Sequence, residues 1–256
     1  MTINWQETAA AIWQPKKQKL RPVQHLDSID LKQLLGIEHQ KKQLLSNTRR
    51  FLAGEPANNA LLWGARGTGK SSLIKAVFNA LKDQGLRLIE VDRDDLVDLP
   101  TIVDDIRSLP QRFILYCDDL SFGENERGYR HLKTVLEGSI ERPPENVRLY
   151  ATSNRRHLLP EAMQDNSGTR ISDGEIHYGD AVEEKISLSD RFGLWLSFYA
   201  GSLEQYLTIV DSLFVGQNLD TEPLHEAALL FAAARASRSG RTAHQFYNQF
   251  THQGKG

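Results

Sequence analysis

The chain has 256 residues, of which 40% are hydrophobic and 25% are charged, the make-up of a globular protein rather than a disordered one. Its 31 Lys and Arg residues against 33 Asp and Glu residues give a formal net charge of −2, which excludes a strongly basic nucleic-acid coat. The single cysteine, Cys117, excludes an intramolecular disulfide framework and a zinc site built from cysteines. No apolar run approaches the roughly 18 residues that cross a bilayer, and the N-terminus lacks the order of a signal peptide. We therefore expect an intracellular, cytoplasmic protein.

Residues 1–33 have the composition of an arm rather than of a domain. They carry Trp5 and Trp13, followed by PKKQKLRP, which places four cations between two prolines with no acid. We interpret this arm as a solvated lead-in whose tryptophans dock on the body of the protein. A contact with nucleic acid or with a partner is the alternative. From Leu34 to Leu52 the apolar residues have helical spacing.

From residue 60 onward the apolar pattern alternates between strands and helices. Five segments have the pattern of strands: Ala60–Trp63, Leu86–Val91, Phe113–Cys117, Val147–Thr152 and Trp195–Tyr199. Helical spacing is found at Ser71–Lys82 and at Tyr129–Ile140. Strands that alternate with helices predict an α/β fold over residues 34–200, with a parallel five-stranded sheet covered by helices on both faces.

Two stretches depart from this alternation. Residues 161–190 hold eight acids and two bases with few apolar residues, which predicts a long polar insertion. Beyond residue 200 the strand patterns stop, and three segments with helical spacing follow. We therefore expect a small all-α lid domain over residues 201–256.

Gly64–Ser71 reads GARGTGKS, which fits the P-loop pattern GxxxxGK[ST]. In that pattern glycines let successive backbone N–H groups turn around phosphates, the lysine (Lys70) reaches the outer phosphates, and the Ser71 hydroxyl ligates magnesium. The apolar strand before the loop and the helix after it supply the context that the motif needs. The alternative is a structural glycine turn. The motif predicts binding of ATP or ADP with Mg²⁺.

A second acidic group is expected at the end of a neighbouring strand. The apolar run Phe113–Cys117 is followed directly by Asp118 and Asp119. Asp118 is the candidate to hold magnesium, and Asp119 is the candidate to orient or deprotonate the attacking water. A solvated pair of turn residues at the edge of the sheet is the alternative interpretation.

At this point the sequence resembles the AAA+ ATPases, from about Leu34 to the C-terminus. The usual acidic pair of that superfamily is Asp-Glu, whereas this chain has Asp-Asp, so slow or partner-gated hydrolysis is an open possibility. Asn154, in ATSN, matches the polar sensor that these enzymes place beside the γ-phosphate to hold the nucleophilic water. A residue that caps the following turn is the alternative.

The segment LSDRFG, which contains Arg191, resembles the arginine-finger segment of clamp-loader subunits and of the Holliday-junction branch-migration motor. The resemblance implies that Arg191 acts in trans, on a nucleotide bound by a neighbouring subunit, where a planar cation suits the spreading phosphoryl charge. An ordinary structural salt bridge is the alternative. Arg241 matches a lid arginine that senses the γ-phosphate. Arg238 competes for that role, and a solvated helix cation is the alternative.

The resemblance also implies which residues carry out catalysis, bind the metal and bind the nucleotide. The catalytic set is Lys70, Asp119, Asn154 and Arg191, and the metal set is Ser71 and Asp118. The nucleotide-binding set, in which Ile37 of the Gly36-Ile37 pair packs the adenine, is Ile37, Gly64, Ala65, Arg66, Gly67, Thr68, Gly69, Lys70, Ser71, Ser72 and Arg241. The whole chain further resembles a bacterial family catalogued as domain of unknown function 815, which implies a predicted AAA+ ATPase and no known substrate.

Three functions follow from these patterns. The first is an ATPase that forms a homo-oligomer, a ring or an open ring, and remodels or loads an unidentified protein or nucleoprotein. The second is a nucleotide-dependent binding switch with little intrinsic hydrolysis, and the third is a small-molecule P-loop kinase. A kinase has no use for a sensor asparagine or a trans arginine. Residues 92–110 contain no aromatic residue and no glycine, which argues against the pore loop of a peptide-threading unfoldase.

Overall fold

In the computed structural model, the buried strand β5 (Arg112–Cys117) sends alternate side chains into two different cores. Phe113 and Leu115 belong to one core, whereas Ile114 and Tyr116 belong to the other. Because side chains alternate across a strand, this strand is apolar throughout only if helices cover both faces of the sheet. The structure describes residues 3–121, 128–138, 140–154, 170–172, 175–177, 191–217 and 219–253.

The main sheet has seven strands in the order β2-β1-β4-β5-β6-β3-β9. Besides β5, they are β1 (Ala10–Gln14), β2 (Lys19–Pro22), β3 (Ala60–Gly64), β4 (Leu86–Glu90), β6 (Val147–Ser153) and β9 (Leu194–Phe198). All neighbours are parallel except β1 and β2, which are antiparallel. The predicted α/β class is confirmed. The predicted number of five strands is wrong, because β1 and β2 extend the sheet.

The two additional strands come from the N-terminal segment that was interpreted as an arm. Trp5 and Trp13 are both buried, as the docking of this segment on the body predicted. The Trp5 ring packs edge-on against Phe113 with 4.9 Å between centroids, and the Trp13 indole N–H donates to an Asp98 carboxylate oxygen at 2.9 Å. The sequence pattern did not indicate these two strands, because a basic turn separates them and because β2 is an exposed, polar edge strand.

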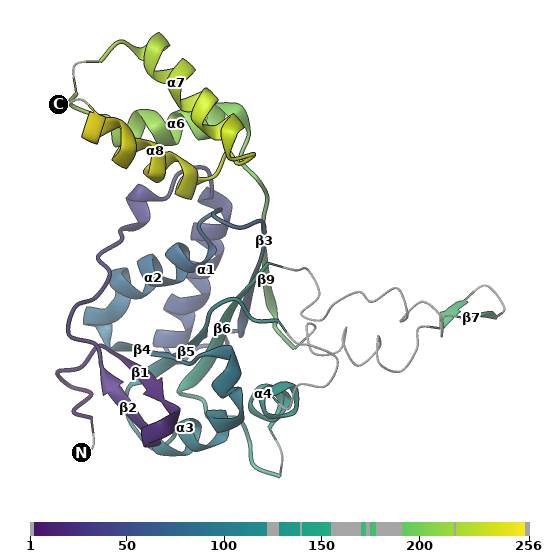
Figure 1. The fold of residues 1–256 in the computed structure, drawn as a ribbon. Coiled ribbons are helices and arrows are strands. Elements are labelled where there is room, and N and C mark those ends of the chain that lie inside the picture. The colour runs from purple at the N-terminus through teal and green to yellow at the C-terminus, as the bar shows by residue number, and fades with distance from the viewer. Residues whose placement is uncertain are drawn as a thin grey trace.

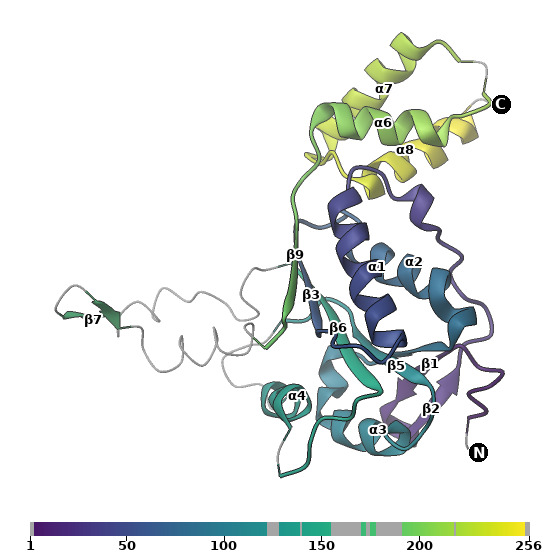
Figure 2. The same cartoon turned by 180° about the vertical axis from the view of Figure 1, so that it is seen from behind.

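Two pairs of helices cover the two faces of the sheet (Figures 1 and 2). On one face lie α1 (Glu38–Leu52) and α2 (Lys70–Leu81), and on the other lie α3 (Leu99–Ile106) and α4 (Gly128–Glu137). Four short 3₁₀ helices complete this part: η1 (Pro15–Lys17), η2 (Leu31–Gln33), η3 (Lys82–Gln84) and η4 (Arg93–Asp98).

The three predicted C-terminal helices are α6 (Leu203–Leu213), α7 (Thr221–Ala234) and α8 (Gly240–Gln253). They have a core of their own, built around Tyr206, Phe214 and Phe246, and they sit beyond the carboxyl ends of the β3 and β9 strands (Figure 1). The predicted polar insertion at 161–190 lies outside the described residues except for a hairpin of β7 (Arg170–Ser172) and β8 (Glu175–His177).

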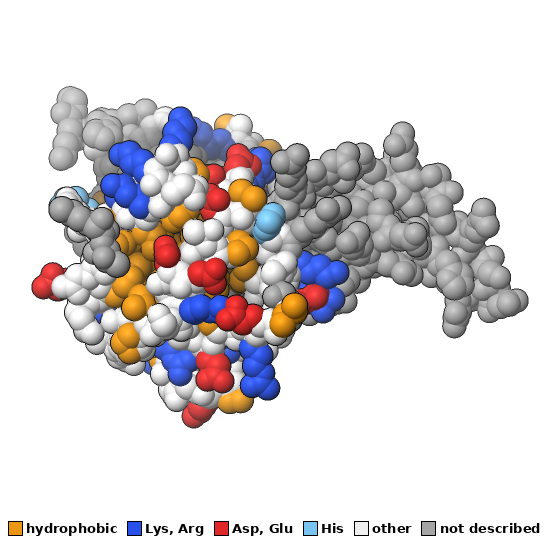
Figure 3. All heavy atoms as spheres, turned by 90° about the horizontal axis from the view of Figure 1, so that it is seen from below, with side chains coloured by type: hydrophobic (Ala, Val, Ile, Leu, Met, Phe, Trp, Pro, Cys, Tyr) orange, Lys and Arg blue, Asp and Glu red, His pale blue; other side chains and the backbone are white. Residues whose placement is uncertain are grey.

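The surface bears charges of both signs. Seen from below, lysine and arginine side chains are interspersed with aspartate and glutamate on the described part of this face (Figure 3), as the nearly balanced composition leads one to expect. None of the described helices is long and apolar enough to cross a membrane.

Candidate functional site

The predicted P-loop joins the end of β3 at Gly64 to the start of α2 at Lys70. Gly64 has to be glycine, because a Cβ there would lie 1.8 Å from the carbonyl oxygen of Phe198 on β9. Gly69 precedes α2 with a φ of 94°, which a glycine adopts without strain. The first N–H groups of α2 have no intrahelical partner, so they are donors for an anion held in the loop.

Lys70 is buried at the floor of the loop, with 7% of its surface exposed. Its Nζ donates to the carbonyl oxygens of Gly64 at 2.9 Å and Ala65 at 2.7 Å. It also donates to Oδ1 of Asn154 at 3.2 Å. Burial lowers the pKa of Lys70, and the carboxylates of Asp118 and Asp119 oppose that shift. The lysine therefore depends on nearby acceptors to remain charged, and Gly64 and Ala65 serve it as such acceptors.

Asp118 is the best-anchored carboxylate of the site. Its Oδ1 accepts hydrogen bonds from the hydroxyls of Ser71, at 2.7 Å, and Thr152, at 2.5 Å. Burial alone would raise the pKa of Asp118, but the hydrogen bonds from Thr152 and Ser71 outweigh it and hold the pKa below its usual value. Asp118 is therefore an ionised carboxylate beside a serine hydroxyl, two hard oxygen donors of the kind that Mg²⁺ prefers.

Asp119 and Asn154 form a pair at the carboxyl ends of adjacent strands. Asp119 has a φ of 50°, in the left-handed region, and its Oδ1 accepts from Nδ2 of Asn154 at 2.5 Å. Since Oδ1 of the same asparagine accepts from Lys70, the asparagine amide connects the P-loop lysine to the second carboxylate. The predicted residues of the sheet edge are thus brought together in one hydrogen-bonded chain.

A cavity of about 800 Å³ opens above these groups, within the size range of small-molecule sites. It is lined by the P-loop from Arg66 to Ser72, by both carboxylates and Asn154, by the segment 27–37 and by the lid. Its lining also includes apolar side chains, among them Leu34, Ile37 and Ile209. The predicted adenine-packing residue Ile37 therefore lines the cavity, and its Cδ1 would lie 3.6 Å from a Cβ added at Gly69 of the P-loop.

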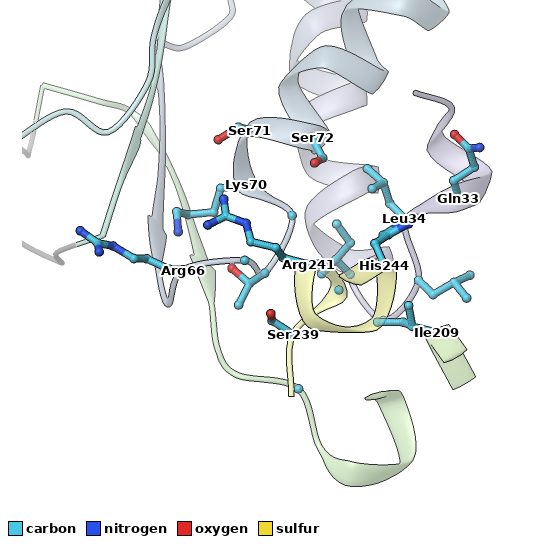
Figure 4. A pocket seen from close by; sticks show the side chains of 18 of the residues that line it. Gln33, Leu34, Arg66, Lys70, Ser71, Ser72, Ile209, Ser239, Arg241 and His244 are labelled. Carbon is cyan, nitrogen blue, oxygen red and sulfur yellow. The ribbon is translucent and has the colours of Figure 1, made fainter. Parts of the chain in front are cut away.

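The lid closes the cavity from the side of α8. Arg241, in the first turn of α8, extends toward Lys70, whereas His244, Ile209 and Leu34 gather away from the lysine (Figure 4). Arg238 also lines the cavity, so both arginines that the sequence offered are in reach of it. The lid and the P-loop are in close contact, because a Cβ added at Gly67 of the P-loop would lie 2.6 Å from the Ser239 hydroxyl oxygen.

Arg191 lies apart from the cavity. It precedes β9, whereas Phe198, at the other end of β9, pairs with Gly64 beside the P-loop. A five-residue strand spans about 16 Å. Arg191 is therefore at the amino ends of the strands, whereas the P-loop of its own chain is at their carboxyl ends. Its Nε forms an ion pair with the carboxylate of Glu137 at the end of α4.

Sequence reasoning missed several residues of this site. Thr152 is the clearest, and its signal was available: it lies near the carboxyl end of β6, two residues before the predicted site residue Asn154. Asp27, which also lines the cavity, had no signal, because its segment is an irregular loop. That loop is anchored on α2 by Asn79, which donates to the carbonyl oxygens of Asp27 and Ile29. Gln205 and His244 of the lid also line the cavity.

The arrangement of the sheet, the P-loop and the helical lid is similar to the AAA+ fold of two solved structures. The chain belongs to the family described as protein of unknown function (DUF815), whose model matches residues 6–254. The resemblance drawn from the sequence is thereby confirmed. No curated protein matches the chain in sequence.

Two solved structures show the likeness of fold. The P216G mutant of RuvB from Thermotoga maritima has a TM-score of 0.56 at 17% identity, over 87% of this chain and 65% of RuvB. The chain thus spans slightly less than two thirds of that protein. The complex of HORMA, CdnC and Trip13 from E. coli MS115-1 contains a chain that matches with a TM-score of 0.53 at 15% identity, over 86% of this chain and 90% of its own length.

Proposed function

We propose that this protein is an ATPase, which binds ATP or ADP with Mg²⁺ and hydrolyses ATP to ADP and phosphate within an oligomer. The observation that carries the proposal is the hydrogen-bonded chain from Lys70 through Asn154 to Asp119, which stands beside the Ser71–Asp118 pair on the floor of the cavity. A cation, two carboxylates, a hydroxyl and a helix N-terminus at one place are the groups that phosphoryl transfer requires.

The donor set at Ser71 and Asp118 fits magnesium. Mg²⁺ is usually held by one or two protein oxygens, with substrate phosphates and water completing its shell. In the described part of the chain no group of three or more His, Cys, Asp and Glu could hold a metal ion, so a cage built wholly from those side chains is not found there. When bound, the ion supplies charge neutralisation at the phosphates.

The remaining groups divide the work of hydrolysis. Asp119 orients or deprotonates the attacking water, Asn154 holds that water beside the γ-phosphate, and Arg241 reads the γ-phosphate from the lid. Arg191 cannot reach the P-loop of its own chain, because the length of β9 separates them. It is therefore assigned to the nucleotide of a neighbouring subunit, where its planar cation stabilises the charge of the transition state.

The cellular task that we propose is remodelling or loading of a protein or nucleoprotein partner. Threading of a peptide is disfavoured, because the apolar residues between β4 and β5 serve the core rather than a pore. Leu96, Leu99 and Ile102 are fully buried there. The aspartates of the same interval are a poor surface for gripping the phosphate backbone of nucleic acid.

A nucleotide-dependent switch is the second candidate, and Asp119 favours it. This side chain is one methylene shorter than the glutamate usual in the superfamily. Its carboxylate also accepts a hydrogen bond from Asn154. In that case binding of ATP, rather than its hydrolysis, controls the partner.

Turnover by Asp119→Asn tests the proposed function. The substitution removes a base while preserving size, so we expect ATP and ADP binding to persist and steady-state phosphate release to be lost. Calorimetry and a phosphate-release assay on the same preparation measure the two properties. Release of phosphate at the parental rate by the variant excludes Asp119 as the base. No release by the parental protein, with or without a partner, supports the switch.

A further inference from the structure

Thr152 is a buried residue on β6 that the proposed mechanism does not yet use. Only 2% of its surface is exposed, and it faces the neighbouring end of β5, where the chain turns after Cys117. Its side-chain oxygen has two partners: it donates to Asp118 Oδ1 and accepts the backbone N–H of Asp119 at 2.9 Å. Its carbonyl oxygen accepts the N–H of Leu120 at 2.6 Å.

One threonine thus holds three consecutive residues of the turn that carries both carboxylates. Asp119 needs such support, because its φ of 50° lies in the left-handed region, which L-residues seldom adopt. The hydrogen bond to the Asp119 amide stabilises that conformation, in which the Asp119 carboxylate meets Asn154. The hydrogen bond to Asp118 fixes the carboxylate that also accepts from Ser71.

We propose that Thr152 is a positioning residue, whose hydroxyl sets the magnesium carboxylate Asp118 and the base Asp119 in register through one oxygen atom. This inference rests on the proposed ATPase function, but the contact itself can be measured without nucleotide. Groups that orient metal ligands and bases change metal affinity or activity roughly 10–100-fold when they are removed.

The test compares Thr152→Val, which keeps the shape and removes the hydroxyl, with Thr152→Ser, which keeps the hydroxyl. The matched control is Thr48→Val on α1. Thr48 is equally buried, and its hydroxyl oxygen bonds to the Leu44 carbonyl and the Tyr150 hydroxyl, away from the cavity. If Thr152→Val does not fold, Thr152→Ala takes its place.

The first readout is amide hydrogen exchange of the nucleotide-free protein, resolved by NMR. Thr152→Val should speed exchange at Asp119, whose partner is the hydroxyl, more than at Leu120, whose partner is the carbonyl oxygen. Thr152→Ser should restore protection. Unchanged exchange at Asp119 in Thr152→Val would overturn the proposed contact.

The second readout is function. We expect Thr152→Val to lower kcat roughly 10–100-fold, with little change in KM and a higher Mg²⁺ concentration for half-maximal rate. Thr152→Ser and Thr48→Val should stay near the parental rate. A parental rate and parental Mg²⁺ dependence in Thr152→Val would refute the positioning role while leaving the ATPase intact.

If the parental protein itself releases no phosphate, the ATPase proposal fails, and Thr152 is judged by binding. The gain in ADP affinity on adding Mg²⁺ should then be smaller in Thr152→Val than in Thr152→Ser. An equal gain in the two variants would overturn the inference.

Discussion

At the scale of single residues, the site is organised around groups that each serve two partners. The Asn154 amide accepts from Lys70 and donates to Asp119, and Asp118 accepts from two hydroxyls through one oxygen. Such shared contacts make each side chain dependent on the others, so single substitutions here are expected to be non-additive. Lys70 is the group on which we expect nucleotide binding to depend most, because it is a buried cation at the floor of the loop.

Removal of the Lys70 ammonium should weaken nucleotide binding. Hydrogen bonds to charged groups contribute about 1.5–3 kcal/mol, so Lys70→Ala should raise the Kd for ATP and ADP roughly 10–100-fold or more. Arg66→Ala is the comparison, since Arg66 occupies a variable position of the motif and should show a smaller loss. Calorimetry measures both, and a thermal melt checks that each variant is folded. Parental ATP affinity in Lys70→Ala would rule out the P-loop assignment.

At the scale of elements, the sequence predicted strands β3, β4, β5, β6 and β9, the P-loop, the acidic pair and the three lid helices, because each has a local pattern. It did not predict β1 and β2. A short strand followed by a basic tip and an edge strand of lysine, arginine and proline has the composition of a solvated arm. What makes this segment part of the sheet is non-local: β1 pairs with β4, more than seventy residues downstream.

The pairing of β1 predicts that its tryptophan contributes to the stability of the whole molecule. Trp13 is 4% exposed, so Trp13→Ala should lower the free energy of unfolding by about 3–5 kcal/mol. Val97→Ala, at a position 46% exposed, should change it by less than about 0.5 kcal/mol. Urea unfolding followed by circular dichroism measures both. Equal stability of Trp13→Ala and the parental protein would show that the segment is a detachable arm.

The site shows the same division between local and non-local information. Asp118, Asp119 and Asn154 were predicted because they end apolar strands. The contributions of Gln205, His244 and Asp27 were not predicted. Gln205 is on α6, His244 is on α8 and Asp27 is in a loop, and these elements meet at the cavity only through tertiary packing. Thr152 lies between these cases, since its strand position was known but its two partners were not.

At the scale of the whole molecule, the proposed function requires more than one subunit to complete the site. The P-loop and Arg191 lie at opposite ends of the paired strands β3 and β9. The proposed hydrolysis therefore requires that two subunits meet. Within its own chain Arg191 pairs with Glu137, and this contact allows a control. If the arginine were only structural, Glu137→Gln and Arg191→Ala should have similar effects. If it is a finger, Glu137→Gln should retain most of the turnover.

The most direct test of this claim is the ATPase rate of Arg191→Ala mixed with Lys70→Ala. Alone, Arg191→Ala should bind ATP nearly normally yet lose turnover by roughly 10³-fold, and Lys70→Ala should be nearly inactive because it binds nucleotide only weakly. In the mixture an intact P-loop can meet an intact arginine, so the account predicts a rate above the sum of the separate rates. It also predicts that the specific activity of the parental protein rises with concentration. A mixture that shows only the sum of the two rates, with parental specific activity constant on dilution, would contradict it.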